Sequence, residues 1–180
     1  MPELNILKDA YGKAAALGEE ICQFLESAPM PAIDDSISSS DQIAAVRALI
    51  KPWRGSQVES ALWLVVGELD RSHSVSQNDP SAVGSFWHGI MHRREGDFSN
   101  AKYWFRRVGS HDVHPQLAEQ IASYSGFSSE FPLKKLTDSS TLAFDLVDCC
   151  QSAASSKPQW KEDLALICWW EWQMLLQHCL

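Results

Sequence analysis

WHGIMHRREGDFSNAKYWFRRVGSHDVH, residues 87–114, holds four of the chain's six histidines and four arginines between tryptophans and a tyrosine. Gly96 and Asp97 divide it into two segments with helical character, because glycine often ends a helix and aspartate often caps the start of one. We therefore expect a helical hairpin over residues 81–108. The first helix would end at Glu95 and the second would start at Phe98.

Helical periodicity extends along the rest of the chain. Apolar residues recur at three- and four-residue steps, and no convincing strand is present. The sequence therefore predicts an all-α fold, a single domain over residues 1–180 in which about seven helices form a bundle around a central hairpin. Helices are expected over residues 4–28, 43–50, 55–74, 81–95, 98–108, 116–124, 142–155 and 158–177, with a loop at 30–40. The expected core includes Trp63, Trp87, Trp104, Trp169, Trp170 and Trp172.

The composition is that of an ordinary globular protein, with 45% hydrophobic and 21% charged residues. A net charge of -8 argues against nucleic acid as a partner. No run approaches the roughly 20 apolar residues that cross a bilayer, and the first residues do not form a signal peptide. We therefore expect a cytoplasmic protein with no membrane partner. Its five cysteines include no CxxC pair, which favours reduced thiols over a disulfide framework.

One stripe of the first hairpin helix carries chemistry-bearing side chains. His88, His92 and Glu95 follow at i, i+4 and i+7, so they lie within about 60° of one another around the helix axis. Trp87, Ile90 and Met91 form the adjoining apolar arc, which places the stripe at the edge of buried surface. Such an edge is where the pKa of an imidazole can be tuned.

Three interpretations of this stripe remain open. His88 and His92 could hold a divalent ion such as zinc or iron, as an HxxxH pair can. They could bind substrate or transfer protons without a metal, with Glu95 as the nearest acid. They could also form a structural polar network. A metal would need a further ligand, for which the sequence offers His73, Glu95, His111 and His114.

The helix before the hairpin ends in a second polar row. Asp70, His73 and Gln77 lie at i, i+3 and i+7 and share one side of that helix. We expect Asp70 to orient His73, because a carboxylate on one ring nitrogen raises the basicity of the other. A solvated helix end is the alternative. A turn at residues 78–80 would bring this row beside the stripe.

Arginines and aromatic residues flank the histidines. Arg93 and Arg106 are the expected anion-binding residues, since guanidinium groups bind carboxylate or phosphate in bidentate geometry. Tyr103 and Trp104 are expected to contact substrate. The arginines could equally pair internally, and Glu171, in an almost wholly apolar helix, is a candidate partner that must be paired or protonated if buried. Glu171 could also orient a residue of the site without contacting the substrate itself.

Two stretches of the chain resemble known proteins. HGIMHRREGDFSNAKYWF resembles one tetratricopeptide-type hairpin, with Gly89 at the close-contact position and Ala101 and Phe105 on the second helix. SHSVSQ, WHGIMHRREGDFSNAKYWFRRVGSH, FDLVDCC and WWEWQMLL together are similar to a family of uncharacterised small helical proteins of bacteria and fungi. That resemblance implies one structural unit over about two thirds of the chain, and it implies no activity.

The sequence thus favours a small soluble enzyme that acts on a polar, anionic small molecule by hydrolysis, elimination or isomerisation. The catalytic residues would be His73, His88, His92 and Glu95. No nucleotide cofactor is expected, because no glycine pattern fits a phosphate-binding loop or a dinucleotide fingerprint. The alternative is a tetratricopeptide-like module that presents aromatic and arginine side chains to a protein partner without catalysis.

Overall fold

The computed structural model describes residues 16–28, 30–156 and 158–180. All regular secondary structure in these ranges is helical, which confirms the predicted all-α class, although nine α-helices are present there instead of about seven. They are α3 (Glu19–Ser27), α4 (Ser40–Leu49), α5 (Gln57–Val65), α6 (Leu69–Ser76), α7 (Ala82–Glu95), α8 (Phe98–Val108), α9 (Val113–Ser123), α10 (Leu142–Ser156) and α11 (Lys161–His178). Two 3-10 turns, η1 (Lys51–Trp53) and η2 (Leu133–Lys135), complete the set.

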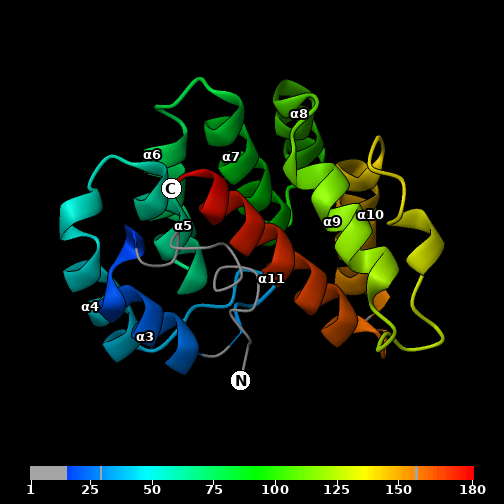
Figure 1. The fold of residues 1–180 in the computed structure, drawn as a ribbon, viewed down its shortest axis with the longest axis horizontal. Helices are drawn as coiled ribbons and strands as arrows, with labels where there is room; N and C mark the ends of the chain where they lie inside the picture. Colours follow the sequence, from blue (N-terminus) through cyan, green and yellow to red (C-terminus); the bar gives the residue numbers. More distant parts are fainter. Residues whose placement is uncertain (1–15, 29, 157) are drawn as a thin grey trace.

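The helices pack around α7, α8 and α11. The predicted hairpin of α7 and α8 is present, with α6 against α7 and α10 against α8. The last helix, α11, runs across the molecule and contacts α5, α9 and α10 (Figure 1). Helices α3 and α4 lie on one side of it and α9 and α10 on the other. No helix among the described residues is long and apolar enough to cross a membrane.

Local sequence explains the hairpin. Gly96 ends α7 in the left-handed conformation with a φ of 87°, and the Asp97 side chain caps α8 by accepting the Asn100 backbone N–H at 3.1 Å. The two helices approach closely at Gly89. A Cβ atom there would lie 3.1 Å from the Phe105 ring, so glycine permits this contact. The hairpin helix bounds expected from the sequence are therefore confirmed.

The single helix expected over residues 55–74 is wrong, because the chain breaks into α5 and α6. Gly67 adopts a φ of 74°, a left-handed value that ends the helix. A Cβ at this position would lie 2.3 Å from the Ser36 carbonyl oxygen, so the loop before α4 packs closely against Gly67. The apolar spacing continues across Gly67, and this continuity concealed the break in the sequence.

Several other boundaries differ from expectation. The helix predicted from residue 4 lies outside the described residues up to 15, and its described part is interrupted at Gly18, whose φ is 85°. Helix α9 starts at Val113, three residues before its predicted start at residue 116, and α11 starts at Lys161, three residues after the predicted Pro158. Helix α10 starts at Leu142, as expected.

Tryptophan contributes much of the core. Five of the six predicted core tryptophans are buried, namely Trp63, Trp87, Trp169, Trp170 and Trp172. Trp104 is the exception, because it is only partly buried and covers a histidine of α7 instead of filling the interior.

Candidate functional site

Three histidines meet where α6 leads into α7. His73 lies near the C-terminal end of α6, and His88 and His92 lie one turn apart on α7. The His73 ring centroid is 4.5 Å from that of His88 and 5.6 Å from that of His92, and the centroids of His88 and His92 are 4.8 Å apart. One ligand nitrogen from each ring lies within 4.8 Å of the other two. The turn between the helices thus brings the polar row of α6 beside the stripe of α7.

His88 is the most buried member of this three-histidine cluster. The residue is 2% exposed, and its ring stacks on Trp104 of α8 with the centroids 3.9 Å apart. Its Nδ1 atom is buried and has no hydrogen-bond partner. Burial lowers the pKa of His88 to about 3, with smaller contributions from the other two histidines and Arg107. The ring is therefore neutral near pH 7 and has a nitrogen lone pair to offer.

The ring of His92 has a polar partner at each nitrogen. Nδ1 lies 2.5 Å from Glu95 Oε1, and the Asn100 side-chain amide donates to Nε2 at 3.1 Å. A carboxylate beside Nδ1 holds the proton on that nitrogen, which leaves Nε2 as the acceptor. His92, Glu95 and Asp97 also form a second set with ligand atoms within 4.8 Å of one another, but both of its carboxylate residues are exposed.

The second hairpin helix supplies the rim of the cluster. Asn100, Trp104 and Arg107 follow at i, i+4 and i+7, so they share one face of α8. The Arg107 guanidinium carbon lies 5.1 Å from the Trp104 ring centroid. Tyr103 is 46% exposed and meets Trp104 edge-on. An exposed guanidinium held against the Trp104 ring, beside the neutral ring of His88, suits an anionic group.

Arg107 and Asn100 are not among the site residues predicted from the sequence. The signal was present, because residues 100, 104 and 107 repeat on α8 the spacing that residues 88, 92 and 95 have on α7. Pairing the two stripes across the hairpin would have selected Arg107 as the arginine on the same face of α8 as Trp104.

Arg93, which the sequence offered as an anion-binding residue, lies elsewhere. It is 2% exposed and forms a bidentate ion pair with Glu171 of α11, with Nη1 3.2 Å from Oε1 and a second contact between Nη2 and Oε2. Burial alone would lower the pKa of Arg93, but the Glu171 carboxylate offsets this effect and raises it. Of the two roles considered for Arg93 and Glu171, the structure shows the internal ion pair.

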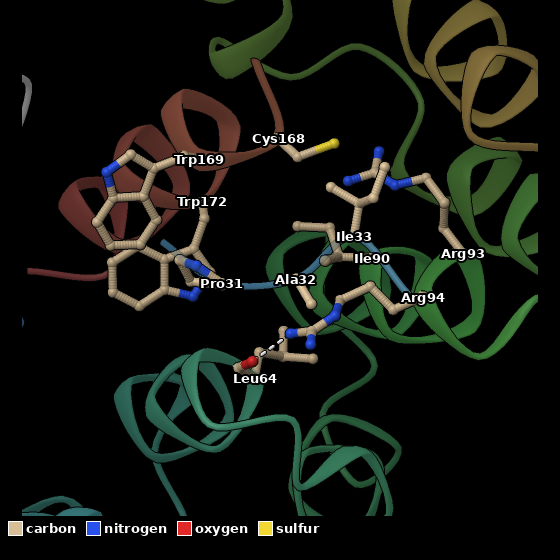
Figure 2. Close-up of a pocket in the computed structure, with 10 residues that line it drawn as sticks. All are labelled: Pro31, Ala32, Ile33, Leu64, Ile90, Arg93, Arg94, Cys168, Trp169 and Trp172. Atoms are coloured by element: carbon tan, nitrogen blue, oxygen red, sulfur yellow. Dashed lines mark hydrogen bonds between the residues drawn. The ribbon is translucent and has the colours of Figure 1, made fainter. Parts of the chain in front are cut away.

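Arg93 and Arg94 border a small cavity under α11 (Figure 2). Its volume is about 20 Å³, and apolar side chains such as Ile90 and Trp172 form most of the remaining wall. Arg94 donates to the Leu64 carbonyl across one edge, as the dashed line in Figure 2 shows. The space would hold about one water molecule, so it does not admit a substrate.

Two further predicted residues also lie apart from the cluster. Arg106 is exposed and projects about 200° around α8 from Trp104, which places it on the opposite face of that helix. Asp70 is exposed, and within the described part of the chain its carboxylate forms no hydrogen bond with His73. The orienting carboxylate near the cluster is Glu95, on His92.

The remaining candidate ligands gather in a separate group. His111 and His114 pack around Phe86, with ring centroids 5.2 and 5.1 Å from it, and His111 also lies 4.6 Å from the ring of His178. Phe86 is about 200° from His88 around α7, so this group lies on the other side of the helix. The third imidazole of the cluster is therefore His73.

No protein-family model matches the chain, and neither does any curated protein or solved structure. The resemblance to small helical proteins of bacteria and fungi stays a prediction. The resemblance of the α7–α8 hairpin to a tetratricopeptide-type hairpin also stays a prediction.

Proposed function

We propose that this protein is a small enzyme in which His73, His88 and His92 hold a divalent metal ion, zinc or iron, and that it converts a polar, anionic small molecule. The observation that carries the proposal is the convergence of three imidazoles from two helices, one of them buried with an unpartnered nitrogen. Buried imidazole nitrogens are nearly always hydrogen-bonded, so an unpartnered one at such a cluster points to a ligand.

The arrangement fits a metal after small side-chain movements. Nitrogens bound to one tetrahedral zinc ion at about 2.1 Å lie about 3.4 Å apart, whereas the present nitrogens lie within 4.8 Å. His73 is partly exposed near the end of its helix, so its side chain can rotate inward while His88 stays fixed under Trp104. On His92, the ion would take the place of the Asn100 amide at Nε2. Three protein ligands leave a coordination position for substrate or water, as catalytic sites do.

The surrounding side chains favour an anionic substrate. Arg107 supplies a positive charge beside Trp104, and it contributes to the lowered pKa of His88, which supports a place for it at the cluster. A carboxylate or phosphate held by Arg107 would place its reacting atoms near the three imidazoles. A bound metal would polarise such a substrate or activate water, which are the contributions needed for hydrolysis, elimination or isomerisation. Glu95 would keep His92 in the required tautomer.

We also infer that the protein works in the cytoplasm. All five cysteines lie among the described residues and none forms a disulfide, which fits a reducing compartment.

Metal content of the purified protein tests the proposal. Protein produced in medium supplemented with zinc and iron, purified without chelators and measured by plasma mass spectrometry, should contain about one ion per chain. His73→Gln and His88→Gln should each lose the ion. The matched control is His178→Gln, which removes an exposed histidine outside the cluster and should retain it.

The possible results separate the functions considered. A metal-free wild-type protein that also fails to bind added zinc or iron(II) in calorimetry overturns the metal centre. Binding of a small anion that depends on His88 and Arg107 would then support metal-free acid–base chemistry. If the protein bound neither ions nor small anions, the tetratricopeptide-like interaction module would become the preferred function.

A further inference from the structure

Two of the five cysteines lie side by side in the interior, although they belong to different helices. Cys150 is part of α10 and Cys168 is part of α11, and these helices pack against each other. The Cys168 thiol donates a hydrogen bond to the Cys150 sulfur. Cys150 is buried and Cys168 is partly buried. The fold therefore holds two thiols in direct contact.

The ion pair between Arg93 and Glu171 flanks these thiols. Arg93 lines the small cavity together with Cys168, and Figure 2 shows the Cys168 sulfur pointing toward the Arg93 guanidinium. The hydrogen bond from Cys168 lowers the pKa of Cys150, and the Arg93 charge adds to this effect, whereas burial and Glu171 oppose it. The same hydrogen bond raises the pKa of Cys168. Of the two thiols, Cys150 is therefore the one that more readily forms the reactive thiolate.

A small oxidant has a route to Cys150. The residue lines a hollow of about 200 Å³ between the end of α7, α10 and the loop before α4, and Arg93 lines the same hollow. Hydrogen peroxide is close to water in size, so a hollow of this volume admits it. Because Cys150 is only 4% exposed, bulky thiol reagents have much less access to it.

The other cysteines of the neighbourhood are not placed to react with Cys150. Cys149 projects about 100° away from it around α10, so the two sulfurs do not face each other. Burial raises the pKa of Cys149 to about 11, which keeps it a neutral thiol near pH 7. Cys179 lies beyond the C-terminal end of α11, and burial raises its pKa to about 11 as well. Cys168 is thus the expected partner of Cys150.

We propose that Cys150 and Cys168 are a redox-active thiol pair, which peroxide converts to a disulfide between α10 and α11 and which a small dithiol reduces again. The Cys150 sulfur attacks one peroxide oxygen and the O–O bond breaks, which leaves a sulfenic acid, while the departing hydroxide takes the thiol proton and becomes water. The Cys168 sulfur then attacks the sulfenic sulfur. The S–S bond forms as the S–O bond breaks, and the second hydroxide leaves as water with the Cys168 proton. The two thiols are oxidised and the peroxide is reduced, and no step depends on the proposed metal centre.

Counting thiols before and after peroxide treatment tests this pair. Reduced wild-type protein, freed of dithiothreitol, is treated near pH 7 with a few equivalents of hydrogen peroxide, and catalase then ends the reaction. The thiols, counted by a colorimetric assay in guanidinium chloride, should fall from five to three, because one disulfide consumes two thiols. Fresh dithiothreitol should restore all five. Proteolysis without reductant should yield linked peptides that contain Cys150 and Cys168, and this readout needs no variant.

Alanine variants separate the roles of the two thiols. Cys150→Ala should keep its four remaining thiols, whereas Cys168→Ala should lose one thiol to a sulfenic acid that dimedone traps. Cys149→Ala is the matched control, because it removes the adjacent buried cysteine, and it should still lose two thiols. Wild-type protein that keeps all five thiols at a peroxide dose that oxidises the urea-unfolded chain would overturn the proposal. A crosslink through Cys149, or a loss of two thiols in Cys168→Ala, would do the same.

Discussion

Breaking the buried ion pair between Arg93 and Glu171 should strongly destabilise the protein. Both residues are almost fully buried, with exposed fractions of 2% and 1%. Glu171→Gln removes the negative charge and leaves the guanidinium in the interior, for which we expect a loss of about 3–5 kcal/mol in the free energy of unfolding. Two charge-assisted hydrogen bonds worth about 1.5–3 kcal/mol each give a similar total.

A double variant without either charge separates the contribution of the ion pair from that of the volume its side chains fill. Arg93→Met should cost as much as Glu171→Gln, because it leaves a buried carboxylate. The double variant Arg93→Met with Glu171→Leu removes both charges and should lie within about 2 kcal/mol of wild type, since a buried pair contributes little net stability over apolar residues of similar volume. Urea unfolding at pH 7, followed by tryptophan fluorescence, measures all four proteins. Single losses below about 1 kcal/mol, or a double loss equal to their sum, would refute this reasoning.

Three further predictions follow from the packing and the buried histidines. Trp172→Ala should cost about 3–5 kcal/mol in urea unfolding, because the residue is 4% exposed and its ring fills the core. Gly67→Ala should lower the free energy of unfolding by about 2–4 kcal/mol, because its φ of 74° is strained for alanine and the Cβ would lie 2.3 Å from a backbone oxygen. Gly96→Ala is the control, since Gly96 is also left-handed but has open space around it, and the loss there should be about 1 kcal/mol. Burial lowers the pKa of His111 to about 4 and that of His114 below its usual 6.5. As the pH falls, the two imidazoles therefore become protonated in the unfolded chain before they do so in the folded protein. The free energy of unfolding should therefore be highest above pH 6.5 and fall as the pH decreases toward 4, and His114→Gln should make this fall shallower in urea titrations at successive pH values.

The parts of the fold that depend on local sequence could be predicted. Gly96 and Asp97 determine the turn of the hairpin through their own backbone and side chain, so its helix ends were found. The break at Gly67 was not, because it depends on a close approach to the loop at Ser36, about 30 residues away, which apolar spacing does not report. Trp104 was placed in the core on residue type alone, although its partner is the ring of His88.

The candidate site, too, could be predicted only where it depends on local sequence. Helical spacing alone aligns His88 with His92, and the short turn after α6 brings His73 to them. The choice between arginines could not be made locally, because the partner of Arg93 is Glu171, 78 residues further along the chain. Nothing in the sequence near Arg93 shows that its charge is already neutralised in the interior. Arg107 stays open to solvent because its face of α8 borders the cluster instead of the core.

The most direct measurement of the proposed metal centre is a crystal structure of the protein grown with zinc, with anomalous scattering recorded at the zinc absorption edge. We predict one strong anomalous peak with nitrogen atoms of His73, His88 and His92 about 2.0–2.1 Å from it. An anomalous peak bound only by the exposed residues Glu95 and Asp97 would contradict the metal centre. So would crystals grown in excess zinc in which hydrogen bonds link the three imidazoles and no ion lies between them.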